Sequence, residues 1–213
     1  MVWKIIAACV ICYLLGGLNF AIICSKLFKS EDVREKGSGS AGLTNYARNY
    51  GGKSTLLVIV GDMGKCFLAV YLTRWVFRDS TLGGYAIADM AKFLAGLFVM
   101  LGHMFPPYFG FKGGKGVLTT AALILAFDWR VFLIGISIFI IIVLVTRYVS
   151  LGSIVAVFSV IPLIWIFFRA DPLVIYYAVT QTIIWLIVCF MHRANIKRLL
   201  SGTETKFSLA RKK

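Results

Sequence analysis

Residues 131–168 read VFLIGISIFIIIVLVTRYVSLGSIVAVFSVIPLIWIFF. A helix crosses the hydrocarbon core of a bilayer with about 20 apolar residues, so this run is too long for one span. Thr146-Arg147-Tyr148 is the point at which polar residues interrupt it. The stretch therefore predicts two membrane-spanning helices that separate at residues 146–148.

Long apolar runs of the same kind fill most of the chain. Hydrophobic residues make up 60% of the 213 residues, against about 45–50% in a typical soluble domain. A soluble core of this size cannot bury them, whereas a bilayer can. We therefore predict an all-α integral membrane protein, formed by one polytopic domain over residues 1–213. About seven transmembrane helices are expected, with a retained first span and a short fourth one, at residues 3–25, 54–77, 85–105, 116–128, 131–147, 150–169 and 173–191.

The formal net charge of +14 indicates anionic partners. The basic residues lie between apolar spans and leave no free basic surface for nucleic acid, so anionic lipid headgroups and anionic substrates are favoured. With these spans, sixteen Lys and Arg residues fall on one side of the membrane and five on the other. The positive-inside rule makes the richer side cytoplasmic. The N-terminus is then outside and the C-terminus cytoplasmic, and the basic tail after Ser201 is expected to be mobile or to lie on anionic headgroups.

Three polar segments interrupt the apolar pattern, all on the predicted cytoplasmic side. Residues 37–48 read GSGSAGLTNYAR, residues 111–117 read FKGGKGV, and residues 192–199 read HRANIKRL. Each joins Lys or Arg to hydroxyl, amide or bare backbone N–H groups, which are the groups that hold phosphate. Ordinary polar loops and basic helix ends are the alternative. The combination favours one composite site for a phosphorylated, lipid-linked substrate.

Two motif matches are rejected because of their context. The glycine spacing within residues 37–42 matches a dinucleotide-binding fingerprint, but no strand of a βαβ unit precedes it. Residues 113–116 resemble a P-loop, but Phe109 and Gly116 stand where a Walker A motif requires Gly and Ser or Thr. No residues have the spacing of a metal site or a catalytic triad, so neither a metal nor a cofactor is predicted. An enzyme built from these parts would act by positioning and charge neutralisation.

Ionisable residues also occur inside the predicted spans. Asp62 and Lys65 lie one turn apart in the second span, and Asp89 and Lys92 lie one turn apart in the third. Buried ionisable groups in a membrane usually face the bundle interior and pair, so structural pairing is favoured over an ion path. His103, near the cytoplasmic end of the third span, is as consistent with packing as with function. The five cysteines lie in apolar runs and are expected to be packing residues.

The three segments together carry a family resemblance. The chain resembles the bacterial membrane family of acyl-phosphate:glycerol-3-phosphate acyltransferases, often called PlsY, whose segments read G-S-G-N-x-G-x-T-N-x-x-R, G-G-K-G-V and H-R-x-N-I-x-R-L. All three occur here in order, and the resemblance covers essentially the whole chain. It implies that a long-chain acyl phosphate donates its acyl group to the 1-hydroxyl of glycerol 3-phosphate. The products would be lysophosphatidic acid and phosphate, in the first acylation step of phospholipid synthesis.

The resemblance also implies a multi-pass protein of the bacterial inner membrane with its active site at the cytoplasmic face. The residues expected to be catalytic are Ser38, Arg48, Lys115, His192 and Asn195. The residues expected to bind substrate are Gly37, Ser38, Gly39, Ser40, Thr44, Asn45, Arg48, Lys112, Gly113, Gly114, Lys115, Gly116, His192 and Asn195. Arg48, Lys115 and Asn195 are expected to hold the phosphate of glycerol 3-phosphate. No protein base is evident, which matches a route in which a substrate phosphate oxygen takes the hydroxyl proton.

Two stretches depart from the family pattern, and two other functions fit part of the sequence. Ser40 replaces the usual Asn and loses the reach of the amide, and residues 62–66 read DMGKC where relatives tend to have Lys-Gly. A transporter of phosphate esters or lipids would explain the buried charges and the short fourth span, but it should show repeat symmetry. A non-catalytic scaffold leaves the three segments unexplained. The sequence is consistent with a monomer as well as with an oligomer.

Overall fold

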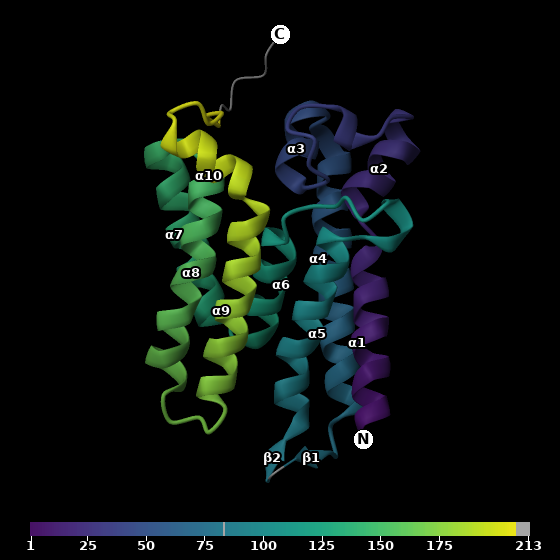
Figure 1. The fold of residues 1–213 in the computed structure, drawn as a ribbon, viewed down its shortest axis with the longest axis vertical. Helices are drawn as coiled ribbons and strands as arrows, with labels where there is room; N and C mark the ends of the chain where they lie inside the picture. Colours follow the sequence, from purple (N-terminus) through teal and green to yellow (C-terminus); the bar gives the residue numbers. More distant parts are fainter. Residues whose placement is uncertain (83, 208–213) are drawn as a thin grey trace. The chain divides into compact units, whose positions relative to one another are not determined.

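The computed structural model describes residues 1–82 and 84–207 (Figure 1). The chain packs into two compact units, Met1–Phe127 and Asp128–Lys213, and each is described by itself. The first unit contains α1 (Val2–Gly17), α2 (Phe20–Lys29), η1 (Val33–Glu35), α3 (Leu43–Asn49), α4 (Gly52–Val76), β1 (Thr81–Leu82), β2 (Tyr85–Ala86), α5 (Ile87–Met104), η2 (Pro107–Phe109) and α6 (Val117–Phe127). The second contains α7 (Trp129–Thr146), α8 (Val149–Phe168), α9 (Val174–Met191) and α10 (Arg193–Leu200).

The helical membrane architecture predicted from the sequence is confirmed. Six helical segments within the described residues are long and apolar enough to cross a membrane: Val2–Lys29, Gly52–Val76, Ile87–Phe109, Trp129–Thr146, Val149–Phe168 and Val174–Met191. The remaining apolar helix, α6, has 11 residues. Its length of about 16 Å is roughly half of the hydrocarbon thickness of about 30 Å. The count of seven spans and the orientation of the termini stay predictions.

The break predicted at residues 146–148 is present. Helix α7 ends at Thr146 and α8 begins at Val149. Arg147 between them adopts a left-handed conformation with φ of 63°, and its N–H donates to the Val143 carbonyl at 2.8 Å. A residue in this conformation satisfies a carbonyl of the last turn and stops the helix. The chain therefore reverses within two residues, which packs α7 against α8 as neighbours.

The predicted first span, 3–25, is interrupted, which the sequence analysis did not anticipate. Helix α1 ends at Gly17 and α2 starts at Phe20. Asn19 caps α2, because its Oδ1 accepts the Ile22 N–H at 3.1 Å. Asparagine is favoured at this position since its side chain satisfies an N–H group that the first turn leaves open. The interruption exposes backbone carbonyls inside the unit, and these become part of the buried cluster described below.

Close helix packing in the first unit depends on small residues. Helix α1 lies along α5, and α4 packs against α5 and α6. A Cβ atom at Gly16 would collide with the backbone of Val99, and one at Gly102 would collide with the carbonyl of Tyr13. Small residues at such positions allow the backbones of membrane helices to approach closely. The two glycines therefore fix α1 on α5.

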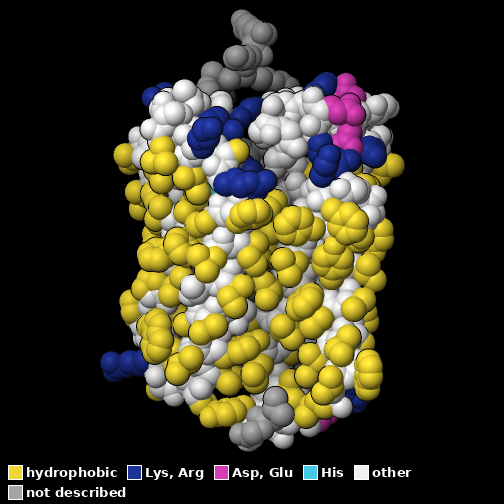
Figure 2. All heavy atoms as spheres, in the orientation of Figure 1, with side chains coloured by type: hydrophobic (Ala, Val, Ile, Leu, Met, Phe, Trp, Pro, Cys, Tyr) yellow, Lys and Arg dark blue, Asp and Glu magenta, His cyan; other side chains and the backbone are white. Residues whose placement is uncertain are grey.

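The outer surface of each unit is apolar, as a lipid environment requires. Apolar side chains cover most of the surface between the ends of each unit (Figure 2). Leu144 and Ile166, for example, are 72% and 66% exposed. In contrast, charged side chains gather over α2 and α3 at one end of the first unit (Figure 2).

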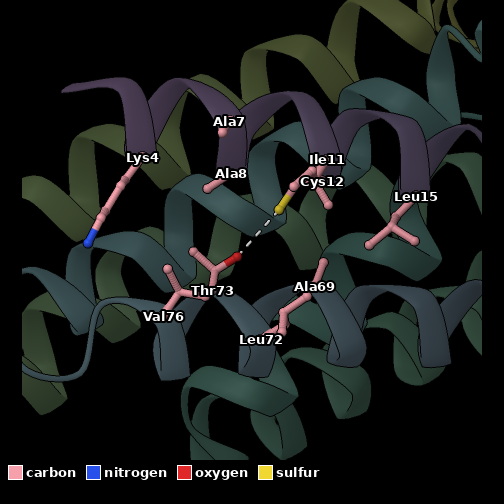
Figure 3. Close-up of a pocket in the computed structure, with 10 residues that line it drawn as sticks. All are labelled: Lys4, Ala7, Ala8, Ile11, Cys12, Leu15, Ala69, Leu72, Thr73 and Val76. Carbon is pink, nitrogen blue, oxygen red and sulfur yellow. Dashed lines mark hydrogen bonds between the residues drawn. The ribbon is translucent and has the colours of Figure 1, made fainter. Parts of the chain in front are cut away.

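A pocket of about 240 Å³ lies between α1 and α4. Figure 3 shows apolar side chains of both helices around it and the Lys4 side chain at one end. Its polar contact joins the Cys12 thiol to the Thr73 hydroxyl, 3.5 Å apart. No residue of the three polar segments lines this pocket. The pocket is therefore separate from the candidate site.

Candidate functional site

The side chain of Asn45 shapes the first polar segment, residues 37–48. Its Oδ1 accepts the Ser38 N–H at 3.0 Å. Its Nδ2 lies 2.9 Å from the Val33 carbonyl and 3.0 Å from the carbonyls of Lys36 and Ser40. The amide is buried, with 3% of the residue exposed. Asn45 thus closes the segment into a compact loop, and its predicted contact with substrate stays a prediction.

Three predicted site residues of this loop project outward. Ser38, Thr44 and Arg48 are exposed. The side chain of Arg48, in the last turn of α3, makes no hydrogen bond or ion pair within the described chain. An exposed guanidinium of this kind suits the recognition of a phosphate, because Arg presents a planar fork of donors.

Arg34 fastens this loop to the second polar segment. Its guanidinium pairs with both carboxylate oxygens of Asp32, at 2.9 and 2.8 Å. The same guanidinium donates to the carbonyls of Phe109 and Lys112 at 2.6 and 3.0 Å. The hydrogen bonds from Arg34 lower the pKa of Asp32, so that carboxylate stays ionised. The loop before α3 and the loop before α6 are therefore held together by one side chain.

The backbones of the two segments also meet directly. The Ala41 N–H donates to the Gly113 carbonyl at 3.3 Å. The N–H groups of Gly113 and Gly114 donate in turn to the carbonyls of Met104 and His103, at 3.0 and 3.1 Å. Two of the three segments that are predicted to form one site therefore lie side by side. Lys115 follows, half-buried, and Gly116 leads into α6 with a left-handed φ of 78°.

These hydrogen bonds change the role expected of the glycines. The sequence suggests that bare N–H groups point at a phosphate, yet the N–H groups of Ser38, Gly113 and Gly114 are bonded within the protein. A Cβ atom at Gly114 would collide with Nε2 of His103, and one at Gly113 would collide with the His103 carbonyl. The two glycines of the second segment allow close packing. Their contact with substrate, like that of Gly37, Gly39, Ser40, Lys112 and Gly116, stays a prediction.

A buried charged cluster lies next to the two loops. The Asp62 and Lys65 side chains pair within α4 at 2.7 Å and are 1% and 3% exposed. His103 of α5 is buried beside them, with Nδ1 3.2 Å from the Lys65 ammonium. Asp89 and Lys92 form a similar pair within α5 at 2.9 Å, but the Asp89 side chain is 42% exposed. Both ion pairs therefore form within one helix, between residues one turn apart.

The third polar segment lies in the second unit. His192 ends α9 and precedes α10, and its Nδ1 lies 2.8 Å from the Val188 carbonyl. A carbonyl only accepts, so Nδ1 carries the proton and the ring orientation is fixed. Asn195 lies on α10, and its amide donates to Glu204 Oε1 at 2.7 Å. Both residues are buried. That all three segments form one site stays a prediction.

Glu204 holds the start of the tail to the second unit, and the expectation that the tail is mobile or lies on anionic headgroups stays a prediction. Its carboxylate accepts from the Ser150 hydroxyl and from Arg198 Nε, both at 2.7 Å. The Phe207 N–H donates to the Arg147 carbonyl at 2.6 Å. Burial raises the pKa of Glu204, but the hydrogen bonds from Asn195, Ser150 and Arg198 outweigh it and lower the pKa overall. Residues 208–213 lie outside the described residues.

Three residues that hold these segments in place are not among the predicted site residues. Asn19, Arg34 and Glu204 each bond to or hold a predicted segment. Two of them carried a signal that was available: Asn19 is a polar residue inside an apolar run, and Glu204 is an acid inside a basic tail. Arg34 is one of the sixteen basic residues on the predicted cytoplasmic side, and its sequence context carries no other signal. Among the described residues, no group of three His, Cys, Asp or Glu side chains is arranged to bind a metal ion.

Comparisons with known proteins point in one direction. A model described as glycerol-3-phosphate acyltransferase matches residues 6–202. A glycerol-3-phosphate acyltransferase of Chlorobaculum tepidum is 37% identical, with 97% of this chain and 98% of that protein aligned. The protein of the same name from Bacillus subtilis is 36% identical, with 92% and 94% aligned.

Solved structures agree with these relatives. The crystal structure of PlsY, described as an integral membrane glycerol 3-phosphate acyltransferase in its glycerol 3-phosphate form, superposes with a TM-score of 0.82. It is 33% identical and covers 96% of both chains. The lysophosphatidic acid form of PlsY has a TM-score of 0.80 and 32% identity, with 96% of this chain and 95% of the other covered.

Proposed function

The chain belongs to the glycerol-3-phosphate acyltransferase family, and we propose that it transfers a fatty acyl group from a long-chain acyl phosphate to the 1-hydroxyl of glycerol 3-phosphate. The products are lysophosphatidic acid and inorganic phosphate. The observation that carries this proposal is the likeness over 96% of the chain to a relative in its glycerol 3-phosphate form. The polar segments at residues 37–48 and 111–117 support it, because their backbones are hydrogen-bonded to each other and both carry cationic side chains.

The proposed donor fits a site without a covalent catalyst. Acyl phosphate is a mixed anhydride whose leaving group is phosphate, so the acyl carbon is already activated. The 1-hydroxyl oxygen attacks that carbon and the bond from the acyl carbon to the phosphate oxygen breaks. The hydroxyl proton passes to a phosphate oxygen. Catalysis then consists of holding two anionic substrates in contact, which positioning and electrostatic stabilisation provide.

Cationic and hydroxyl side chains of the first unit suit this task. Two phosphate groups repel each other, and cations reduce that repulsion. Arg48 and Lys115 supply positive charge, and the exposed Ser38 hydroxyl supplies a donor in the same loop as Arg48. We assign Arg48 and Lys115 to the phosphate of glycerol 3-phosphate. Ser38 is assigned to the acyl phosphate.

The third segment is assigned to the same reaction. His192 has a fixed ring because Nδ1 is bonded to the Val188 carbonyl. Asn195 has a fixed amide because Nδ2 is bonded to Glu204. Side chains held in this way can orient a substrate with little loss of conformational entropy. We assign Asn195 to the glycerol 3-phosphate phosphate and His192 to substrate orientation.

The proposed location follows from the family and the charge pattern. The protein is a multi-pass membrane protein with an apolar outer surface. We assign it to the bacterial inner membrane with its active site at the cytoplasmic face. Anionic lipid headgroups are its expected surroundings there, because the chain carries a net charge of +14.

Phosphate release tests the proposal. Purified protein in lipid receives palmitoyl phosphate with and without glycerol 3-phosphate, and Lys115→Ala runs beside the wild type. Lys4→Ala, a basic residue in the first turn of α1, is the matched control. Release should depend on glycerol 3-phosphate, persist in Lys4→Ala and disappear in Lys115→Ala. No release from folded wild-type protein would contradict the proposal and favour transport of a phosphorylated lipid.

A further inference from the structure

Lys65 is the centre of a cluster that closes the interruption between α1 and α2. Its ammonium lies 2.7 Å from Asp62 Oδ1, 2.9 Å from the Gly16 carbonyl and 2.8 Å from the Leu18 carbonyl. The last carbonyls of a helix have no partner within the helix and require one from elsewhere. An ammonium has three hydrogens, and four acceptors surround this one, the three oxygens and His103 Nδ1 at 3.2 Å. Lys65 thereby satisfies the open end of α1.

The cluster reaches the first polar loop through Asn19. The Asn19 amide donates to the Ala41 carbonyl at 3.0 Å, and its oxygen caps α2. Asp62 Oδ1 lies 3.4 Å from the Phe20 N–H, so the start of α2 faces the same carboxylate. Asn19 is fully buried. The position of Ala41 is therefore tied to the charged pair in α4.

The cluster reaches the second polar loop through His103. Two donors face His103 Nδ1: the Lys65 ammonium at 3.2 Å and the Asn19 amide at 3.5 Å. Both groups donate only, so Nδ1 is the unprotonated nitrogen and the proton is on Nε2. Asp62 Oδ1 lies 3.5 Å from Nδ1 but already accepts from Lys65 at 2.7 Å.

His103 contacts the glycine loop from two sides. Its Nε2 packs against Gly114 so closely that no Cβ atom fits there, and its carbonyl accepts the Gly114 N–H at 3.1 Å. The residue that follows Gly114 is Lys115. The orientation of the His103 ring thus determines where the backbone before Lys115 can lie.

We propose that Lys65, together with Asp62 and His103, is a positioning residue that sets the two polar loops at the spacing that the reaction requires. The proposal rests on the proposed function. The cluster acts through the backbones of Ala41 and Gly114 and is not assigned a contact with substrate. The charges of the cluster are buried, and its members contact several helices and both loops. A change at Lys65 therefore displaces Ser38 and Lys115 together.

Kinetics of a Lys65→Met variant test this role. The matched control is Lys92→Met, which breaks a pair of the same spacing at 2.9 Å that contacts neither loop. We expect kcat/KM for glycerol 3-phosphate to fall by about 100-fold in Lys65→Met, as for a small misplacement of reacting groups. Lys92→Met should retain the wild-type value. A folded Lys65→Met protein with wild-type kcat and KM would overturn the proposal.

A second variant covers the case in which Lys65→Met does not fold. Asp62→Asn combined with Lys65→Gln removes both charges and leaves no unpaired ion, while the Gln amide can still donate to a carbonyl. We expect this double variant to fold and to lose kcat/KM to a similar extent, because the two hydrogens of the Gln amide cannot replace the three of the Lys65 ammonium. Wild-type kinetics in the folded double variant would overturn the proposal.

Nitrogen NMR of the histidines gives a readout that does not need activity. The chain has two histidines, so ¹⁵N-histidine labelling yields two ring systems, and His192→Gln identifies the signals of His103. We expect His103 to show a protonated Nε2 and an unprotonated Nδ1, and Lys65→Met to mix the two tautomers. A protonated Nδ1 in the wild type would overturn the arrangement. Inactive wild-type protein with the expected tautomer would instead contradict the proposed function.

Discussion

The amide of Asn195 donates to the carboxylate of Glu204 at 2.7 Å, and this hydrogen bond joins a predicted substrate-binding residue to the tail that follows α10. The same carboxylate accepts from Ser150 at the start of α8 and from Arg198 on α10. With a side chain that is 6% exposed, Glu204 is a buried anion surrounded by three donors. The tail is therefore part of the structure that orients Asn195.

Replacing Glu204 should lower activity through Asn195. Glu204→Ala removes the carboxylate that accepts from the Asn195 amide, and a hydrogen bond to a charged group contributes about 2 kcal/mol. We expect kcat/KM for glycerol 3-phosphate to fall by about tenfold or more. Lys206→Met, which removes a tail cation above the Tyr148 ring, is the control and should remain near wild type. Equal kcat/KM for Glu204→Ala and the wild type would show that the tail does not contribute to the site.

The attachment of the tail should depend on pH. The folded state lowers the pKa of Glu204 from its ordinary value of 4.5. A lowered pKa means that this stabilisation is present above the ordinary value and is lost as the pH falls through the lower folded value. The protection of the Thr203 and Phe207 amides against hydrogen exchange, relative to an unfolded chain at the same pH, should therefore be high near neutral pH and be lost on acidification below about 4. Protection that is the same at both pH values would contradict the attachment.

Gly114 should tolerate no side chain. In Gly114→Ala the new Cβ atom meets His103 Nε2 and the Ala41 carbonyl, so the loop must move. We expect a loss of activity of at least about tenfold, since overpacking costs about 1–3 kcal/mol. Gly64→Ala is the control, because nothing lies within 4 Å of its Cβ position, and it should stabilise α4 slightly. Measuring thermal unfolding beside phosphate release distinguishes a displaced loop in a folded protein from loss of the fold.

The KM for glycerol 3-phosphate should change when Arg34 is replaced by a residue of the same charge. Arg34→Lys cannot pair with Asp32 and also reach the carbonyls of Phe109 and Lys112, because an ammonium lacks the planar fork. We expect the KM for glycerol 3-phosphate to rise by about tenfold as the two loops separate. Arg78→Lys, in an exposed pair with Asp79, should leave KM unchanged. An unchanged KM in Arg34→Lys would show that the loops hold their positions without it.

The sequence predicted the features that depend on hydropathy. The turn at Arg147 was visible because a charged residue stands between two runs that are each long enough to span a bilayer. The short α6 was visible because it begins directly after the second glycine-rich segment. The interruption at residues 17–20 was not visible, since Gly17 and Leu18 continue the apolar run and Asn19 alone carried the signal.

The hydrogen-bond partners of the candidate site could not be read from the sequence. Glycine next to lysine suggested free N–H groups, whereas those of Gly113 and Gly114 bond to carbonyls at the end of α5. The spacing of Asp62 and Lys65 indicated a pair, but the carbonyls at the end of α1 became partners only through tertiary packing. The local sequence pattern thus indicated where the polar segments lie along the chain. Long-range contacts determined which of their donor and acceptor atoms remain free of partners within the protein.

The identity of the acyl donor is the most direct test of the central claim. Mass spectrometry would measure lysophosphatidic acid formed from glycerol 3-phosphate by purified protein, with palmitoyl phosphate, palmitoyl-CoA or palmitoyl acyl carrier protein as the donor. The proposal predicts product with palmitoyl phosphate alone, in step with released phosphate. Product from either thioester, or no product from palmitoyl phosphate, would contradict it.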